Sequence, residues 1–455
     1  MPLRAATWLH VSGYRYQLRR MENALLNAQA DSPGRLWRGS LAAGCALTVA
    51  ALAGCLFLSR LWPQPSLGDA RIAMGQTSGA LYVKVGDTWH PVLNLASARL
   101  IAAAAANPRQ VPESVLARTK HGLLLGIPGA PDVIAPPLPA RESYWTVCDS
   151  DGGAGTTVLL GADLPVGVGA GQALLVAAGT GAPAYLLYRG RRAMVDLAER
   201  AVVRALRLQG RTPHLVSQTL LNAVPEAPPI AVPRVRGAGT PAGAWLPGLR
   251  VGDVLRITGA AGEEFYVVLS AGVQRISQVV ADLLRFTGSS DVTTVAPGLL
   301  RTAPNVDALP VAGIPEQVPS DAGGSTWCAV WTPAASGQPD IGFLAAPAAP
   351  AAAPVRLAQA DGAGPAVDAF SIAAGHSAYV ATQSRFGDRT RVDTRYLVTD
   401  TGVRYAVHDE EAARLLGLPA MPAPAPWPVL AALPCGPELS REKASVARDT
   451  VPPAP

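Results

Sequence analysis

One uncharged apolar run constrains this chain more than any other feature. Residues 41–59 read LAAGCALTVAALAGCLFLS, and no charged side chain interrupts them. A helix rises by about 1.5 Å per residue, so a run of about 19 residues just spans a hydrocarbon core that is about 30 Å thick. We therefore predict a single transmembrane helix over residues 41–60.

Basic residues on one side of this run predict its orientation. Those that precede it are Arg4, Arg15, Arg19, Arg20, Arg35 and Arg38. Only Glu22 and Asp31 oppose them in charge. Because the cytosolic flanks of membrane helices carry an excess of Lys and Arg, we expect the N-terminus in the cytosol. Everything after Arg60 and Trp62 is then expected outside the cytosol.

A lipoprotein signal is the second interpretation of the same run. Leu52-Ala53-Gly54-Cys55 matches a lipobox, at which a signal peptide would be cleaved and Cys55 acylated. However, the 40 residues before the run exceed an ordinary n-region, and residues 56–58 stay apolar where a polar tether is expected. We therefore favour an uncleaved helix, in which Cys45 and Cys55 act as small apolar residues.

The composition of the chain is globular and loop-rich. Hydrophobic residues make up 49% and charged residues 16%, with 45 Gly and 42 Pro. Outside the first forty positions the Arg residues are scattered, whereas a nucleic-acid-binding protein would cluster them on one element, often beside aromatic residues. We therefore expect no nucleic-acid partner.

The sequence lacks the common motifs for nucleotide and metal binding. None of Lys84, Lys120 and Lys443 follows a Gly, so the phosphate-binding loop GxxxxGK[ST] is missing, as is a GxGxxG between a strand and a helix. The six His residues never stand at metal-ligand spacing, and no two Cys lie in a CxxC pair. We expect no catalytic residue, no cofactor-binding residue and no metal ligand.

Three cysteines follow the apolar run: Cys148, Cys328 and Cys435. In an oxidising compartment two of them could pair. The surroundings of two are similar, YWTVC over residues 144–148 and WCAVW over residues 327–331, which suggests facing strands. We predict a disulfide between Cys148 and Cys328 and leave the state of Cys435 open.

A pattern of strand, Gly turn, strand and short helix recurs four times after the apolar run. Its turns fall at Gly86, Gly190, Gly272 and Gly402. The fourth copy is the clearest, with a hairpin over residues 396–407 and a helix that begins at Glu411 and stops at Gly417. Each unit is too small to be stable alone, and the spacing is too uneven for a stacked solenoid.

Strand-like stretches between the copies could supply a shared central sheet that holds the disulfide. These are residues 143–148, 156–160, 172–178, 326–331 and 378–382. We therefore predict an α+β fold, in which a central antiparallel β core is surrounded by four small repeat domains. Pro-rich segments at 127–131, 225–233, 346–354 and 421–428 serve as stiff connectors.

These patterns give a complete expected organisation. It comprises a basic cytosolic tail with an amphipathic helix at 1–40, the transmembrane helix at 41–60, repeat 1 at 61–140, the first part of the central β core at 141–182, repeat 2 at 183–240, repeat 3 at 241–321, the second part of the core at 322–384, and repeat 4 with the C-terminal segment at 385–455.

The predicted cytosolic tail contains an amphipathic helix that could bind a partner protein or lipid. Tyr14, Leu18, Met21 and Leu25 fall on one face of a helix. Basic residues Arg15, Arg19 and Arg20 lie on other faces. Periodicity favours equally a helix that lies on anionic lipid and a helix that docks on a partner.

Several segments resemble the EccB family of type VII (ESX) secretion systems, which mycobacteria and related actinobacteria carry. They include VSGYRYQLRRMENAL before the apolar run, GDARIAMGQTSGALYVKVGDTWHPVLNLASARLIAAAAANP, and LLLGIPGAP. The resemblance continues through Cys148, Cys328 and residues 401–405 to residues 437–440, and so covers essentially the whole chain.

This resemblance implies a core subunit in the inner membrane that assembles with EccC, EccD and EccE. It also implies four periplasmic repeat domains around a central β core with one disulfide. Other EccB copies and membrane lipid are further implied partners. Peptidoglycan is another candidate partner, because the repeats of the family are said to resemble a cell-wall-binding fold of phage lysins.

Some descriptions of the family call it an ATPase, and ATP would be a cofactor only if they are right. This sequence offers no motif for it. Our leading hypothesis is therefore a structural subunit of the secretion machine. A membrane-anchored peptidoglycan-binding module and an ATPase are the alternatives.

Overall fold

The computed structural model describes residues 8–27, 34–61, 67–150, 155–162, 164, 171–259, 262–287, 291–318, 320–321, 323–334, 339–347, 354–362, 364–382 and 394–448. The chain divides into two units, Met1–Gly68 and Asp69–Pro455. Arg4, Asp31 and Trp62, which entered the orientation prediction, lie outside the described residues, as do the side chains of Arg35, Arg38 and Arg60.

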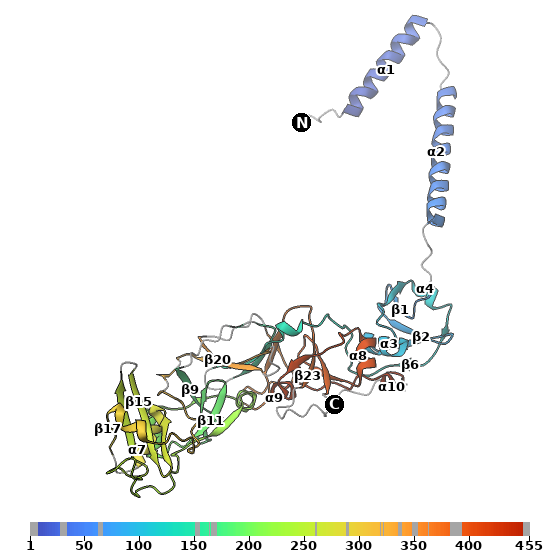
Figure 1. Ribbon diagram of the computed structural model, residues 1–455. Helices are drawn as coiled ribbons and strands as arrows, with labels where there is room; N and C mark the ends of the chain where they lie inside the picture. The colour runs from blue at the N-terminus through green and yellow to red at the C-terminus, as the bar shows by residue number, and fades with distance from the viewer. Residues whose placement is uncertain are drawn as a thin grey trace. The chain divides into compact units, whose positions relative to one another are not determined.

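The first unit consists of two helices, α1 (Trp8–Asn27) and α2 (Gly34–Leu61), drawn in blue in Figure 1. The uncharged apolar run lies within α2, because Ala, Leu and Cys continue a helix without a Pro to interrupt it. Among the residues described, no helix combines the length and the hydropathy that crossing a membrane requires.

A six-stranded sheet forms the central β core of the second unit. Its strands are β7 (Trp145–Ser150), β8 (Thr156–Leu160), β19 (Thr326–Thr332), β20 (Asp340–Ala346), β21 (Val355–Arg356) and β22 (Ala369–Ile372). They lie in the order β20-β19-β7-β8-β22-β21, and all neighbours are antiparallel except β8 and β22. Trp145 of β7, Trp327 of β19 and Phe370 of β22 are buried on one face of this sheet, and a second apolar cluster with Cys148 and Cys328 covers the other.

Two stretches expected in the central sheet pair elsewhere, so that part of the prediction is wrong. Residues 172–177 form β9, which pairs with β10, and residues 378–382 form β23, which pairs with β24. Only six residues separate β9 from β10, and closing a short loop costs little entropy. The sheets of repeats 2 and 4 therefore begin before residues 183 and 385.

Each repeat is a four-stranded unit with one arrangement. Along the chain come three antiparallel strands, here called strands a, b and c, then a helix, and then strand d. Strand d pairs with strand a in parallel, so the order across the sheet is c-b-a-d. Repeat 1 has β1 (Ile72–Gly75), β2 (Leu81–Val85), β3 (Thr88–Val92), α3 (Leu95–Ala102) and β4 (Arg109–Val111). Repeat 2 has β9 (Gln172–Ala177), β10 (Ala184–Tyr188), β11 (Arg191–Val195), α5 (Arg200–Ala205) and β12 (His214–Leu215).

The other two repeats keep this order. Repeat 3 has β14 (Val254–Gly259), β15 (Gly262–Leu269), β16 (Gly272–Ile276), α7 (Gln278–Thr287) and β17 (Thr293–Thr294). Repeat 4 has β23 (Ala378–Thr382), β24 (Arg395–Val398), β25 (Arg404–Val407), α8 (Glu410–Leu416) and β26 (Ala423–Ala425). The b, c and helix parts are those that the sequence indicated, whereas strands a and d were not recognised as parts of the repeats.

Caps and turns in repeat 4 explain why its pattern was the clearest. The side chain of Asp409 accepts a hydrogen bond from the backbone N–H of Ala412 at 2.7 Å and so caps the start of α8. Gly417 ends the helix in the left-handed region, at φ 84°. Gly402 has φ 79° in the hairpin turn, and any side chain there would collide with Phe370 of the central sheet.

A second short helix and an edge segment complete each repeat. The second helices are α4 (Glu113–Leu116), α6 (Gln218–Ala223), the 3-10 helix η3 (Pro297–Thr302) and α9 (Trp427–Ala431). The edge segments run parallel to strand c: β5 (Lys120–His121) and β6 (Leu124–Leu125) in repeat 1, β13 (Glu226–Ile230) in repeat 2, Asn305 in repeat 3, and Cys435 and Leu439 in repeat 4.

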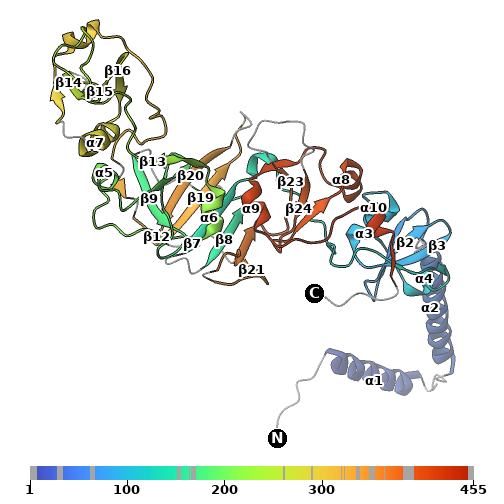
Figure 2. The ribbon, with the colours of Figure 1, turned by 90° about the horizontal axis from the view of Figure 1, so that it is seen from below.

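Helices join the repeats in pairs. The first helices α5 and α7 pack together between repeats 2 and 3, and α3 packs against α8 between repeats 1 and 4. The second helices α6 and α9 pack against each other beside the central sheet, as Figure 2 shows. The hydrophobic core is therefore continuous from one repeat to the next rather than confined to each.

Three short elements close the fold. The C-terminal segment returns to repeat 1, where α10 (Arg441–Ala444) packs against α3 and β27 (Ala447–Arg448) pairs with β6. The strand β18 (Ser320–Asp321) pairs with β9, and the 3-10 helix η1 (Ala140–Glu142) precedes β7. Residues 441–448 thus belong to repeat 1, not to repeat 4 alone.

Candidate functional site

The disulfide lies in the central sheet. Cys148 in β7 and Cys328 in β19 stand directly opposite each other, with an S–S distance of 2.05 Å, and both are buried. This is the pairing predicted from the similar surroundings of the two cysteines. The bridge joins strands separated by 180 residues, so it ties the two halves of the central sheet together.

Beside the bridge, Asp149 connects the central sheet to repeat 2. Its side chain is fully buried and accepts hydrogen bonds from the backbone N–H of Ser217 at 2.6 Å and from Oγ1 of Thr156 at 2.8 Å. Burial raises the pKa of Asp149, while the hydrogen bonds from Ser217 and Thr156 oppose that rise. Sequence reasoning missed this residue, although an Asp inside the apolar strand WTVCDS is the kind of signal that could have marked it.

The joint between repeats 2 and 3 is apolar at its centre and basic at its rim. Val202 and Ala205 of α5 share a buried cluster with Val279 and Leu283 of α7. Two guanidinium groups contact the ring of Phe286, with Cζ of Arg204 4.5 Å and Cζ of Arg285 4.4 Å from the ring centre.

The joint between repeats 1 and 4 depends more on hydrogen bonds. Arg99 at the end of α3 donates to the backbone carbonyl of Leu416 in α8 at 2.7 Å and to Oδ1 of Asn107 at 3.0 Å. Burial lowers the pKa of Arg99, because a buried charge loses its hydration. The same guanidinium thus joins the last carbonyl of α8 to the segment that follows α3, where it also donates to the carbonyl of Ala106 at 3.3 Å, and so links the two repeats.

The predicted docking face of the cytosolic tail lies on α1 and is exposed. The exposed fractions are 65% for Tyr14, 48% for Leu18, 66% for Met21 and 86% for Leu25. Arg15, Arg19 and Arg20 are exposed as well. The role of this helix stays a prediction, because exposed side chains alone do not identify the molecule that binds them.

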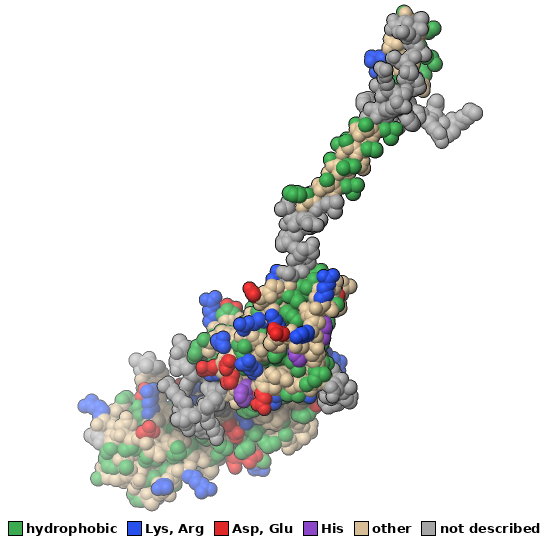
Figure 3. Space-filling view, turned by 90° about the vertical axis from the view of Figure 1, so that its right-hand side faces the viewer, with side chains coloured by type: hydrophobic (Ala, Val, Ile, Leu, Met, Phe, Trp, Pro, Cys, Tyr) green, Lys and Arg blue, Asp and Glu red, His purple; other side chains and the backbone are tan. Residues whose placement is uncertain are grey.

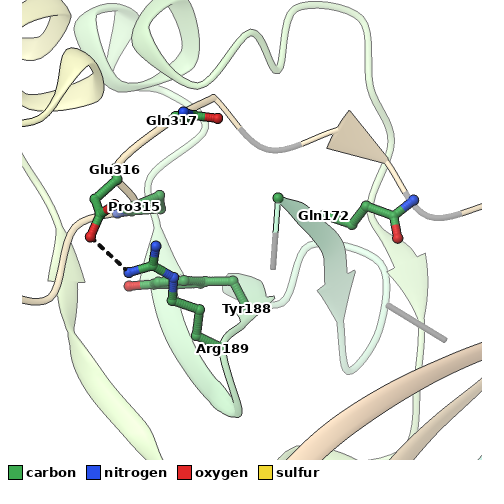
Figure 4. A pocket seen from close by; sticks show the side chains of 7 residues that line it. Gln172, Tyr188, Arg189, Pro315, Glu316 and Gln317 are labelled. Carbon is green, nitrogen blue, oxygen red and sulfur yellow. Dashed lines mark hydrogen bonds and ion pairs between the residues drawn. The ribbon is translucent and has the colours of Figure 1, made fainter. Parts of the chain in front are cut away.

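The structure contains a small pocket at the edge of repeat 2, shown in Figure 4. It has a volume of about 180 Å³ and is lined by Gly171, Gln172, Tyr188, Arg189, Pro315, Glu316 and Gln317. Arg189 pairs with Glu316 at 3.3 Å, and the Tyr188 hydroxyl donates to the carbonyl of Gly313. Burial raises the pKa of Tyr188, so its hydroxyl keeps the proton that it donates.

No group of His, Cys, Asp and Glu in the described part of the chain could hold a metal ion. The thiols of Cys45, Cys55 and Cys435 are exposed and unbridged. The features that the described residues bring together are thus a buried bridge, joints between repeats and an exposed helix face.

Comparison with known proteins decides the family. The family model described as "Type VII secretion system ESX-1, transport TM domain B", EccB, matches residues 3–453. The chain belongs to the EccB family. It is therefore a component of a type VII secretion system, as the sequence resemblance implied.

Relatives of this EccB chain cover it almost completely. The "ESX-2 secretion system ATPase EccB2" of Mycobacterium tuberculosis is 33% identical over 482 residues, which cover 99% of this chain and 97% of the relative. The "ESX-3 secretion system ATPase EccB3" of Mycolicibacterium smegmatis is 34% identical over 481 residues, covering 97% of this chain and 90% of the relative.

Solved EccB structures share the fold. A chain of an intact ESX-5 inner membrane complex matches with a TM-score of 0.74 and 32% identity, over 99% of this chain and 97% of that one. A chain of an EccB3 dimer from the ESX-3 core complex matches with a TM-score of 0.72 and 33% identity, over 83% of this chain and 100% of that one.

Proposed function

We propose that this EccB chain is a structural core subunit of an ESX inner-membrane complex. Residues 41–60 cross the inner membrane once, the N-terminus lies in the cytosol, and residues 61–455 form the periplasmic part. The uncharged run within α2 and the Arg excess before it support this topology. The observation that carries the proposal is the match to an ESX-5 inner-membrane chain over 99% of this chain.

The periplasmic part consists of a central β core and four repeat domains. The common c-b-a-d order and the helix pairs between repeats support this organisation. Such a scaffold presents several surfaces to which other subunits could bind. We expect it to associate with further EccB copies, in line with the dimer formed by the ESX-3 relative.

The cytosolic and membrane helices bind EccC-, EccD- and EccE-type subunits. Support comes from the apolar face of Tyr14, Leu18, Met21 and Leu25, which the chain itself leaves exposed. Contact between this face and water is unfavourable, so a partner that covers it would gain the free energy of burial.

A native gel of detergent-solubilised membranes tests the assembly. One tag is placed at Met1 and another at Pro455, and each is detected separately. Both tags in one very large band are the expected result. If the Met1 tag were lost and the Pro455 tag ran as a small species, cleavage at Cys55 and an anchored module that binds peptidoglycan would replace this proposal.

ATP hydrolysis requires its own test, because the curated relatives carry "ATPase" in their names. The sequence has no GxxxxGK[ST] loop, so the proposed role does not include hydrolysis. Purified chain should show no ATP turnover above that of a mock preparation from cells without the gene. Turnover that co-purifies with the full chain and disappears on truncation of residues 1–40 would contradict this.

A further inference from the structure

The C-terminal segment joins repeat 4 to repeat 1. It first runs along β25, where the backbone N–H of Gly436 donates to the carbonyl of Arg404 at 2.8 Å. The N–H of Leu439 donates to the carbonyl of Ala406, also at 2.8 Å. The segment then crosses to repeat 1, where α10 packs against α3 and β27 pairs with β6. We call residues 436–448 the C-terminal clasp, because they bind the two repeats in turn.

The crossing between the two repeats is short. The carbonyl of Leu439 accepts a hydrogen bond from the backbone N–H of His408 in repeat 4 at 3.2 Å, and α10 already begins at Arg441. Leu439 and Ala444, on either side of the crossing, are fully buried. An interaction at this crossing therefore acts on both repeats at once.

Two basic side chains share one carboxylate at the crossing. Nδ1 of His408 lies 2.7 Å from Oε1 of Glu438, and Nζ of Lys443 lies 2.6 Å from Oε2 of the same side chain. His408 follows β25 in repeat 4, whereas Lys443 belongs to α10, which packs on repeat 1. Figure 3, which looks onto repeat 1, shows His side chains that lie among acidic and basic ones on the surface. Glu438 thus links a side chain of repeat 4 to the helix that lies on repeat 1.

The charged groups around His408 are mostly acidic. Besides Glu438, the carboxylates of Asp409, next in the chain, and of Glu442 in α10 attract it. The hydrogen bond with Glu438 contributes most to raising the pKa of His408. The pKa of Glu438 is lowered, first by the hydrogen bond from Lys443 and then by that with His408. The carboxylate therefore stays ionised between its two partners.

Histidine is the residue type in this group whose charge changes near neutral pH, since carboxylates titrate at about pH 4 and Lys at about pH 10. A raised pKa in the folded chain stabilises the fold below the unfolded value of 6.5. This contribution is lost as the pH rises through the raised pKa of His408. The crossing is therefore expected to be strongest in weakly acidic solution and weaker in alkaline solution.

We propose that the charge of His408 regulates the C-terminal clasp, which holds repeat 1 firmly to repeat 4 when the imidazole is protonated and loosens when it is neutral. This adds a pH response to the joint that Arg99 also spans. It goes beyond the proposed function and does not depend on it, because every group involved lies within residues 69–455.

Hydrogen exchange of the full chain in detergent, followed by mass spectrometry, tests the proposal. Ala444 and Ser445 donate backbone hydrogen bonds at α10, so peptides that cover residues 441–448 report whether the clasp is closed. Rates at pH 5.5 and pH 8.5 are each divided by the intrinsic exchange rate at that pH. An exposed ion pair changes a local equilibrium by up to about fivefold, so we expect these peptides to exchange about two- to fivefold faster at pH 8.5. Peptides from repeat 3 should show no such change.

Substitutions separate the charge of His408 from its shape. His408→Lys keeps a cation at both pH values, so residues 441–448 should exchange slowly at both. His408→Gln carries no charge, so exchange should be fast at both. Glu438→Gln removes the carboxylate that both cations share and should also abolish the pH response. The matched control is His376→Gln, because Nδ1 of His376 lies 3.1 Å from the carbonyl of Ala374 in its own turn. This control should keep the wild-type response.

Three results would overturn the proposal. Equal exchange of the wild-type clasp at the two pH values would show that the crossing does not respond to pH. A response that persists in His408→Gln would assign it to another group. Equal acceleration of peptides from repeats 2 and 3 would mean that pH acts on the whole domain rather than on the clasp. Slow exchange of His408→Lys at pH 8.5, together with fast exchange of His408→Gln at pH 5.5, would support it.

Discussion

The two units of the chain treat their hydrophobic residues in opposite ways. In α1 and α2, large apolar side chains such as Leu25, Leu47 and Phe57 are more than two-thirds exposed. In residues 69–455, side chains such as Leu100, Leu174 and Leu283 are fully buried in clusters that join the repeats. The domain therefore carries its own core, whereas the helices leave their large apolar side chains exposed.

Removal of the disulfide should give the largest loss of domain stability. The bridge closes a loop of 180 residues, for which chain entropy predicts a contribution of about 5 kcal/mol. C148A/C328A should lower the free energy of unfolding by about that amount, as measured by denaturant unfolding of the full chain in detergent. C435A is the matched control and should change little. Equal midpoints with and without a reducing agent would contradict the prediction.

The joint between repeats 2 and 3 should show the next largest effect. Leu283 is fully buried between α7 and α5, so Leu283→Ala leaves a cavity and should cost about 3 kcal/mol. Leu25→Ala removes the same atoms from an 86% exposed site and should leave denaturant unfolding unchanged. Similar losses for the two variants would mean that α1 shares the core of the domain.

A smaller, pH-dependent effect is expected in repeat 1. Glu113 accepts hydrogen bonds from the backbone N–H groups of Thr77 at 2.8 Å and Ser78 at 2.9 Å, and holds the turn between β1 and β2. The bond from Ser78 contributes most to lowering the pKa of Glu113, to about 2. A lowered pKa stabilises the fold above the unfolded value of 4.5, and this contribution is lost as the pH falls toward 2.

Thermal unfolding between pH 5 and pH 2 measures this contribution. The wild-type chain should lose stability more steeply across that range than E113Q, which cannot ionise at this position. Glu142→Gln, at an exposed carboxylate paired with Arg141, serves as the control and should follow the wild-type slope. Parallel slopes for E113Q and the wild type would show that the turn does not depend on the carboxylate.

The sequence predicted local features well because their causes are local. The hairpin and helix of repeat 4 follow from a turn at Gly402 and a stop at Gly417, and the facing aromatic strands around Cys148 and Cys328 indicated the bridge. Strands β9 and β23 were assigned to the wrong sheet, since an apolar strand does not encode its partner. Two-residue strands such as β12 and β17 show no periodicity at all.

Residues whose role depends on burial also escaped prediction. Asp149 is significant because Ser217, 68 residues away, donates to it inside the core. Arg99 joins repeats 1 and 4 through a carbonyl 317 residues away. In the sequence Arg99 resembles an ordinary solvated charge, and Asp149 is marked only by its place in the apolar strand WTVCDS. Their partners become apparent only when the repeats are packed together, which is where long-range hydrogen bonds arise.

Substitutions on α1 should have the smallest effect on unfolding and yet abolish assembly. L18S/M21S/L25S removes exposed apolar side chains and should change the domain's free energy of unfolding by less than about 0.5 kcal/mol. On native gels the large complex should be lost, because the partner-facing surface is removed. The control Y16S/N23S alters a different face of the same helix and should leave the complex intact.

This variant also decides between the two interpretations of α1. If L18S/M21S/L25S kept the large complex, while R15E/R19E/R20E released the tail from anionic vesicles, α1 would lie on lipid rather than dock on a protein. A domain that unfolds normally without its complex would show that folding and assembly depend on separate parts of the chain. The exposed helices would then supply the assembly, and the buried joints of the repeats would supply the fold.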